Sequence, residues 1–227
     1  MDLFEYMREQ QKETEAPLAS RLRPTTLDEM VGQQHIIGKD KLLYRAIKAD
    51  KLSSIILYGP PGTGKTTLAK VIAHTTSAEF LQINATSAGK KDMEEVIAQA
   101  KNNQGMYGRK TILFIDEIHR FNKGQQDYLL PFVEDGTIIL IGATTENPYF
   151  EVNGALLSRS IIFELKSLSK EDIRTLILRA VNDREKGLGA YDAVIDAVGL
   201  DVVVNSVLPL VKMGGDVCVY GVMTKNP

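Results

Sequence analysis

The run GPPGTGKT, from Gly59 to Thr66, constrains this chain more than any other segment, because it fits the pattern GxxxxGK[ST]. The apolar run Ser54–Tyr58 before it predicts a buried strand, and Thr67–His74 after it predicts a helix with one apolar side. Glycines let backbone N–H groups turn inward around an anion, and a helix N-terminus adds positive potential there. This order of strand, loop and helix predicts a phosphate-binding loop. The alternative is a glycine-rich turn that binds nothing.

Two side chains of the loop carry the chemistry expected of a nucleotide site. Lys65 would reach the β- and γ-phosphates, and the Thr66 hydroxyl would ligate Mg²⁺. The nucleotide-binding residues predicted in this segment are Gly59, Pro60, Pro61, Gly62, Thr63, Gly64, Lys65, Thr66 and Thr67.

A carboxylate pair follows a second apolar run. Thr111–Ile115 is rich in β-formers and leads directly into Asp116 and Glu117. A buried parallel strand would bring both carboxylates to the sheet edge where α/β proteins bind ligands. Asp116 would hold the hydration shell of Mg²⁺, and Glu117 would orient and deprotonate the attacking water. The alternative is an ordinary strand followed by a polar turn, which the phosphate loop upstream argues against.

The bulk properties favour a soluble cytoplasmic protein without a membrane segment. The 27 Lys and Arg against 29 Asp and Glu give a net charge of -2, so a DNA contact would need a local basic patch. The one cysteine, Cys218, excludes an intrachain disulfide framework and suggests a reducing compartment. Met1–Glu5 is not typical of a signal peptide. The three histidines lack metal-ligand spacing and are interpreted as structural or surface residues: His35, His74 and His119.

Alternating apolar periods predict an α/β fold, a parallel sheet flanked by helices in three layers. Ser169 and Asp172 predict a capping box at the start of the last long helix. The expected strands are 54–58, 79–84, 111–116, 137–143 and 160–165. The expected helices are 2–13, 40–50, 67–74, 91–102, 125–134 and 169–186, with a turn-rich segment at 17–33.

With these parts in this order, residues 1 to about 189 resemble the AAA+ ATPases. Within them the chain is similar to the clamp-loader-like branch and to the family of the replication-associated recombination protein A (RarA). The residues that carry the resemblance are Pro17-Leu18-Ala19, Arg23-Pro24, Val31-Gly32-Gln33, the phosphate loop, Phe114 to Phe121, Gly142 to Pro148, and Leu156 to Arg159.

The resemblance implies an Mg-dependent ATP hydrolase and assigns roles outside the two motifs. The segment 23–33 would wall the adenine base, chiefly through Val31 with Gly32. Thr145 would be a sensor that bridges the γ-phosphate and the lytic water. Asn84 would hold the catalytic glutamate inactive until DNA binds, although an Asn at a strand end is often a turn former.

The resemblance also implies partners. Arg159 would be an arginine finger supplied from a neighbouring subunit of a ring-like homo-oligomer, with a surface arginine as the alternative. Single-stranded or forked DNA at stalled replication forks would be the nucleic-acid partner. Basic residues that could contact its phosphates, or form ordinary solvated surface, are Lys90, Lys91, Arg109, Lys110, Arg120 and Lys123.

The last 37 residues depart from that family. Residues 1–190 contain 6 Val and 18 Ile, whereas residues 191–227 contain 10 Val and 1 Ile. Because the two side chains are near-equivalent in folding, the change indicates a join between unrelated sequences near residue 190, as in a chimera. The predicted elements are a strand and turn over 191–199, a helix at 201–212, a turn at 213–215 and a strand at 216–222. Together they resemble part of the nucleotide-binding domain of medium-chain alcohol and sorbitol dehydrogenases. The GxGxxG turn of such domains is absent from this sequence.

The domain organisation predicted from these boundaries has three parts. Residues 1–167 would form the AAA+ core, 168–189 the start of a truncated helical lid, and 190–227 a dehydrogenase-like fragment. The leading function is Mg-ATP hydrolysis coupled to DNA. One alternative is an ATP-binding module with little turnover, because the lid and oligomerisation regions of the family are missing. The other is an inactive fragment of an NAD-dependent dehydrogenase.

Overall fold

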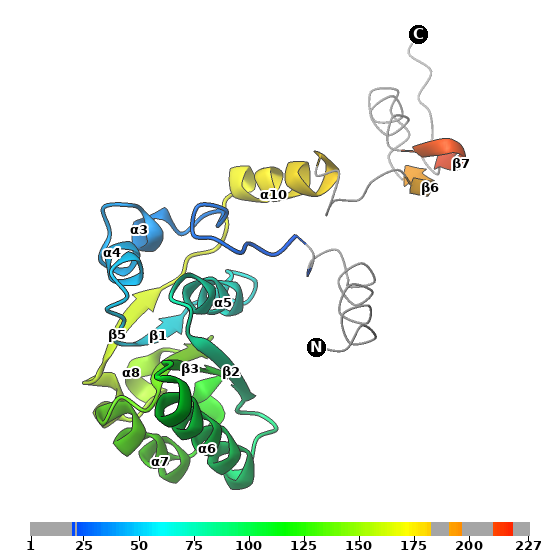
Figure 1. Ribbon diagram of the computed structural model, residues 1–227. Coiled ribbons are helices and arrows are strands. Elements are labelled where there is room, and N and C mark those ends of the chain that lie inside the picture. The colour runs from blue at the N-terminus through cyan, green and yellow to red at the C-terminus, as the bar shows by residue number, and fades with distance from the viewer. Residues whose placement is uncertain (1–19, 21, 183–190, 197–210, 220–227) are drawn as a thin grey trace. The chain divides into compact units, whose positions relative to one another are not determined.

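The computed structural model describes residues 20, 22–182, 191–196 and 211–219. The chain divides into two compact units, one of residues 24–172 and one that combines residues 1–23 with 173–227. Each unit is described separately. The larger unit is a parallel sheet with helices on both faces, as the sequence predicts (Figure 1).

The sheet of the larger unit has five strands in the order β2-β3-β4-β1-β5, and every neighbouring pair is parallel. The strands are β1 (Ser54–Tyr58), β2 (Glu79–Asn84), β3 (Thr111–Asp116), β4 (Ile139–Thr144) and β5 (Ser160–Glu164). All five carboxyl ends therefore meet at one edge. Strand β4 separates β1, which leads into the phosphate loop, from β3, which leads into the carboxylates.

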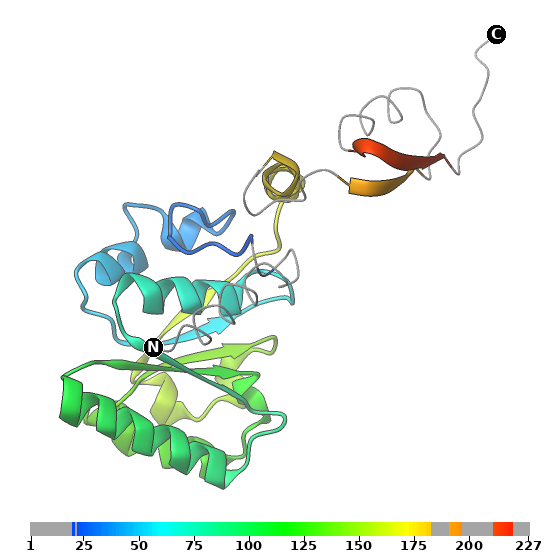
Figure 2. The same ribbon diagram turned by 45° about the vertical axis from the view of Figure 1, so that its right-hand side comes forward.

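Helices cover both faces of this sheet (Figure 2). Helices α3 (Gln34–Ile37), α4 (Leu42–Lys48) and α5 (Lys65–Thr75) contribute to one buried cluster. Helices α6 (Lys90–Tyr107), α7 (Lys123–Glu134) and α9 (Gly154–Leu157) contribute to the other. The remaining helical segments are the 3₁₀ turn η1 (Ile118–Arg120), α8 (Pro148–Glu151) and α10 (Lys170–Asn182).

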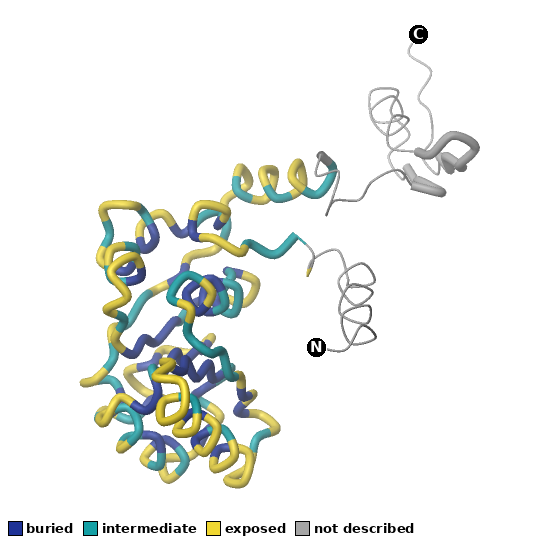
Figure 3. The backbone as a smooth tube through the Cα atoms, in the orientation of Figure 1, coloured by how far each residue is buried: buried dark blue, intermediate teal, exposed yellow. Residues whose placement is uncertain are grey.

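Strand β3 shows why the run 111–115 has no polar alternation. Ile112 and Phe114 belong to the cluster on the α5 face, whereas Leu113 and Ile115 belong to the cluster on the α6 and α7 face. All four side chains are fully buried. The strand is covered on both sides, as parallel strands usually are, and Figure 3 shows the buried strands between helices with exposed outer sides.

The sequence predictions of the five strands and of helices 40–50, 67–74, 91–102 and 125–134 are confirmed within a few residues. Helix α6 is longer than predicted and runs to Gly108, which ends it in the left-handed region (φ 58°). The capping box of α10 is present, because Ser169 and Asp172 bond each other's backbone N–H groups at 2.9 and 3.1 Å. The short helices α3, α8 and α9 and the turn η1 were missed, since four residues or fewer carry no helical period.

The smaller unit contains strands β6 (Tyr191–Asp196) and β7 (Val211–Val219), paired in parallel. The predicted turn at 213–215 is wrong, because β7 continues through it, and β7 also takes the end of the helix predicted over 201–212. The rest of that helix, helix 2–13 and the residues around the join lie outside the described residues. The dehydrogenase resemblance and the domain boundaries stay predictions. Among the described helices, none combines the length and apolar character needed to cross a membrane.

Gly59 is the glycine whose replacement should cost most. Its φ is 143°, and a Cβ there would lie 2.1 Å from the backbone oxygen of Leu165. We expect Gly59→Ala to lower the free energy of unfolding by about 1–3 kcal/mol. An alanine is strained at this φ, and its Cβ would clash with the backbone of Leu165, which cannot move without disturbing the chain after β5. Denaturant unfolding followed by circular dichroism measures the change.

Gly105→Ala is the matched control, since this glycine lies inside α6 with open space around its Cα. We expect that variant to gain about 0.5–1 kcal/mol from helix propensity. Equal stability of the two variants would contradict the close packing of the phosphate loop against Leu165.

Candidate nucleotide-binding site

The phosphate loop is shaped by three glycines in conformations that other residues avoid. Gly59, Gly62 and Gly64 have φ values of 143°, 74° and 95°. Gly64 is the N-cap of α5, so the first N–H groups of that helix have no acceptor within the helix. Gly62 faces open space, since a Cβ at this position would have no neighbouring atom within 4 Å. The loop is therefore an open cradle of backbone donors at a helix N-terminus, which favours an anion.

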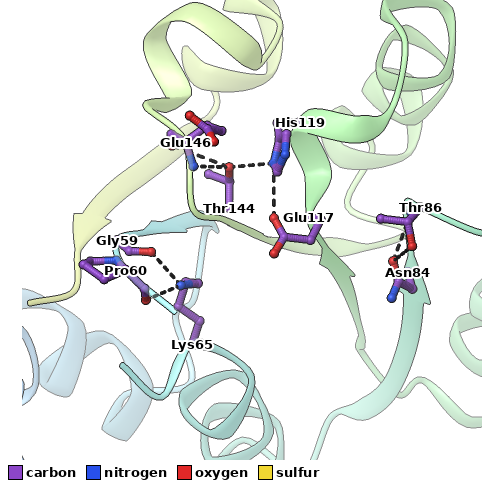
Figure 4. Close-up of polar contacts among 9 residues, drawn as sticks. All are labelled: Gly59, Pro60, Lys65, Asn84, Thr86, Glu117, His119, Thr144 and Glu146. Carbon is purple, nitrogen blue, oxygen red and sulfur yellow. Dashed lines mark hydrogen bonds and ion pairs between the residues drawn. The ribbon is translucent and has the colours of Figure 1, made fainter. Parts of the chain in front are cut away.

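Lys65 folds back over this loop, at the carboxyl edge of the sheet (Figure 4). Its Nζ donates hydrogen bonds to the backbone oxygens of Gly59 at 2.7 Å and Pro60 at 2.8 Å, and the residue is 9% exposed. Burial lowers the pKa of Lys65, and the negative charges of Glu117 and Asp116 oppose that shift. The ammonium group therefore lies within electrostatic reach of both carboxylates, as the motif spacing predicts.

Asp116 ends β3 next to β4 and is half-buried. Burial raises the pKa of Asp116, the charge of Glu117 raises it further, and a backbone hydrogen bond from Glu117 and the charge of Lys65 oppose the rise. A cation bound next to Asp116 would stabilise the ionised form of this carboxyl group.

Glu117 follows in a strained conformation, with φ 53° and ψ 47°. Its Oε2 is buried and has no hydrogen bond, although Nδ1 of His119 lies 3.3 Å away. An unsatisfied buried carboxylate oxygen is costly, and such groups concentrate at functional sites.

These groups fit magnesium and a triphosphate. Mg²⁺ prefers oxygen ligands, and the Thr66 hydroxyl and the Asp116 carboxylate are of that kind. The backbone donors of the loop and the ammonium of Lys65 supply the opposite polarity for phosphate oxygens. Oε2 of Glu117, which has no hydrogen-bond donor, is an oxygen that could accept the proton of an attacking water.

The segment predicted to wall the base lies against this loop. Val31 and Gly32 are half-buried, and a Cβ on Gly32 (φ 75°) would lie 2.7 Å from Cδ2 of Leu168. Gln33, the last residue of that segment, donates from Nε2 to the backbone oxygens of Thr63 at 3.3 Å and Lys166 at 2.7 Å. Gln33 therefore ties the segment to the phosphate loop and to the chain after β5.

The proposed sensor and the proposed switch residue differ in what surrounds them. Thr145 is exposed directly after β4, at the same sheet edge as Glu117. Asn84 lies opposite Asp116 in the sheet register, but its Oδ1 accepts hydrogen bonds from the N–H and the hydroxyl of Thr86 at 3.0 and 2.7 Å. That is the geometry of a turn former, and the contact to Glu117 comes from His119 instead.

Arg159 lies at the other edge of the sheet. It immediately precedes β5, which runs parallel to β1, so it is at the amino ends of the strands. Its guanidinium donates to the backbone oxygen of Ala155 at 2.9 Å and forms an ion pair with Glu134. A five-residue strand spans about 17 Å. Arg159 therefore cannot join Lys65 at the same nucleotide within one chain.

The six basic residues considered for DNA do not form one surface. Arg109 and Lys110 precede β3 and lie at the amino edge, where they pair with Glu79 at 3.3 Å and Asp50 at 2.7 Å. The other four lie in segments that follow β2 and β3, at the carboxyl edge: Lys90, Lys91, Arg120 and Lys123. Only the second group therefore shares an edge with the nucleotide site.

Comparison with known proteins agrees with this architecture. Residues 55–167 match the family described as ATPase family associated with various cellular activities (AAA). The Thermotoga maritima RuvB Holliday junction branch migration motor has a similar structure, with a TM-score of 0.59 and 32% identity over 78% of this chain and 57% of that one. Fold and site together define an AAA-type P-loop ATPase domain, a class whose members use ATP with Mg²⁺.

Within this class, the chain is similar in sequence to replication-associated recombination proteins and to a related ATPase. The replication-associated recombination protein A of Escherichia coli K12 is 54% identical over 179 residues, which are 79% of this chain and 40% of that protein. That of Bacillus subtilis is 51% identical over 180 residues, 79% of this chain and 42% of that protein. ATPase WRNIP1 of Dictyostelium discoideum is 48% identical over 178 residues, 78% of this chain and 20% of that protein.

Over ~180 residues the chain is therefore similar to the replication-associated recombination proteins A. The chain spans 40% and 42% of the length of the two bacterial relatives.

The buried charge of Asp116 should make the nucleotide-free chain less stable at neutral pH. Because its pKa is raised in the folded state, ionisation is costlier there than in the unfolded chain, and the cost appears as pH rises above the ordinary value of 3.8. We expect Asp116→Asn to raise the midpoint of thermal unfolding at pH 7, and this gain to shrink as the pH is lowered towards 4.

Thermal scans of both chains across that pH range measure the effect. Asp127→Asn, a change at an exposed carboxylate on α7, is the control. A gain for Asp116→Asn that does not depend on pH would contradict the electrostatic cause.

Proposed function

We propose that this chain binds Mg-ATP at the carboxyl edge of its sheet and hydrolyses it. The observation that carries the proposal is the grouping of Lys65 with Asp116 and Glu117 at the carboxyl edge of the sheet, on either side of β4. Both carboxylates oppose the lowering of the Lys65 pKa, and Lys65 opposes the rise of the Asp116 pKa. A phosphate loop alone supports nucleotide binding. Oε2 of Glu117, a buried carboxylate oxygen without a hydrogen-bond donor at the same sheet edge as that loop, supports activation of a water.

The residues divide the work as follows. The backbone N–H groups after Gly62 would cradle the phosphates, and Lys65 would exchange its carbonyl partners for phosphate oxygens. Thr66 and Asp116 would hold Mg²⁺, which when bound supplies positive charge against the phosphate oxygens. Glu117 would accept the proton of the attacking water through the oxygen that has no donor.

Residues outside the cradle would complete the site. Val31 and Gly32 would contact the base, and exposed Thr145 would contact the γ-phosphate or the water. Asn84 would act on Glu117 only after releasing Thr86, so its proposed switch role requires a rearrangement of that turn.

Arg159 would complete the site of a second copy. Its position at the amino edge supports action in trans and therefore a homo-oligomer. The same position favours a second candidate function for an isolated chain. Without an arginine from a neighbour, such a chain would bind ATP but hydrolyse it slowly.

DNA is the proposed macromolecular partner. Support comes from the names of the relatives, a replication-associated recombination protein and a Holliday junction branch migration motor, and from the four basic residues at the carboxyl edge. Forked DNA at stalled replication sites is the particular substrate that we propose.

Lys65 and Glu117 should separate ATP binding from hydrolysis. We expect Lys65→Ala to abolish ATP binding, because the cradle loses its cation. Glu117→Gln should keep binding and lower hydrolysis by about 10²–10⁴-fold, because the amide accepts no proton. Calorimetry with Mg-ATP and phosphate release, with and without forked DNA, measure the two steps.

Lys51→Ala, at an exposed lysine before β1, is the control and should match the unchanged chain. Full ATP binding by Lys65→Ala would overturn the site, and full hydrolysis by Glu117→Gln would overturn the assigned base.

Mixing variants should test the role of Arg159. A chain with Arg159→Ala keeps its own cradle, and a chain with Lys65→Ala keeps its arginine, so a mixed oligomer has some complete sites. We expect each variant alone to be inactive and the mixture to regain phosphate release. No recovery in any mixture, with the unchanged chain active, would remove the support for action in trans.

A further inference from the structure

Nδ1 of His119 lies close to both the Thr144 hydroxyl and the Glu117 carboxylate (Figure 4). It is 2.9 Å from Oγ1 of Thr144 and 3.3 Å from Oε2 of Glu117. The His119 side chain is 9% exposed, and Thr144 is fully buried. One ring nitrogen carries at most one proton, so this atom can give a full hydrogen bond to only one of these neighbours at a time.

The contacts of Thr144 assign that proton. Its Oγ1 accepts a hydrogen bond from the backbone N–H of Glu146 at 3.0 Å and lies 3.5 Å from the backbone oxygen of Glu146. With a proton on Nδ1, the hydroxyl accepts two N–H groups and donates to that oxygen, so the Thr144 hydroxyl, the Nδ1–H and the N–H of Glu146 each have a partner. Without it, a nitrogen lone pair would face a carboxylate oxygen at 3.3 Å, which is repulsive.

The same contacts join two strand ends. The bond from Glu146 to Thr144 spans Thr145, so the Thr144 hydroxyl shapes the turn that presents the proposed sensor. Glu117 comes from the end of β3, the strand beside β4. His119 is the side chain that contacts both.

Packing holds His119 in this place. The preceding residue, Ile118, is fully buried in the cluster on the α6 and α7 face. It rests on Gly142 of β4, where a Cβ would lie 2.9 Å from Cδ1 of Ile118. The absence of a side chain at Gly142 therefore lets the η1 turn approach β4 and brings the imidazole to Thr144.

We propose that His119 is a positioning residue, which through Nδ1–H holds the Thr145 turn and the Glu117 carboxylate at a fixed separation. The N–H directed at Thr144 leaves Oε2 of Glu117 without a donor, which is the state in which that oxygen can accept a proton from water. The inference rests on the proposed ATP hydrolysis for its purpose, but its geometry is a property of the nucleotide-free chain.

Nuclear magnetic resonance of the nucleotide-free chain tests the proton directly. With ¹⁵N-labelled histidine at neutral pH, long-range ¹H–¹⁵N correlations distinguish Nδ1–H from Nε2–H rings. We expect His119 to be protonated at Nδ1, and Thr144→Val, but not Thr144→Ser, to shift that nitrogen. His74→Gln, at an exposed position, assigns one of the other signals. An unprotonated Nδ1 of His119 would overturn the proposal, whether or not the chain hydrolyses ATP.

Kinetics tests the positioning role. We expect His119→Ala to lower kcat for ATP by about 10–100-fold with the Kd for ATP unchanged, because the base and sensor lose their common anchor. His119→Asn keeps an amide near the Nδ1 position and should recover part of the rate.

Equal rates of the unchanged, Ala and Asn chains would contradict the proposal, as would weaker ATP binding at constant kcat. If His119→Ala does not fold, the Asn variant and the resonance measurement on the unchanged chain still decide. An unchanged chain that binds no ATP would end the proposed function, while the protonation of Nδ1 would still be measured.

Discussion

The site depends on keeping a buried cation, Lys65, and two half-buried carboxylates, Asp116 and Glu117, together at one sheet edge. Burial disfavours the charged forms of Lys65 and Asp116, and their mutual attraction offsets part of that cost. The charge of Glu117 favours the ammonium and disfavours the Asp116 carboxylate. Three charges with a net negative sum beside an anion cradle are balanced best by a bound divalent cation and phosphate together. The electrostatics of the nucleotide-free site therefore already favour the ligand pair that the chemistry requires.

Sheet order is what brings these charges together. Strand β4 lies between β1 and β3, so the loop and the carboxylates are separated by one strand at the carboxyl edge. The intervening strand ends at Thr144, and Thr145 follows it, so two hydroxyl-bearing residues come from the strand between the loop and the carboxylates. Its Gly142 leaves room for Ile118, which links sheet packing to the position of the η1 turn.

Much of the fold and part of the site could be predicted from the sequence, because both rest on local patterns. The apolar runs at β1 and β3 and the phosphate loop each carry their own signal, and parallel pairing then dictates where Lys65 and Asp116 meet. His119 and Thr144 carried no such signal. Their roles arise from a contact between residues 25 positions apart, across two strands, and a lone histidine without metal-ligand spacing was interpreted as structural or surface. Asn84 was open to two interpretations, because only its bonds to Thr86 distinguish a turn former from a switch.

In the proposed function, the two edges of the sheet divide hydrolysis between one chain and its neighbour. The phosphate loop, both carboxylates, and Val31 and Gly32 of the segment proposed to contact the base all lie within the unit of residues 24–172. Arg159 belongs to the same unit but lies at the opposite edge, where it is occupied by Glu134. To act on a phosphate it must leave that carboxylate, and a neighbouring copy must bring its own cradle to the amino edge. Assembly would therefore replace an exposed ion pair, worth little in water, by a charge-assisted contact with a nucleotide. An arrangement of this kind makes hydrolysis depend on assembly while leaving binding to each chain alone.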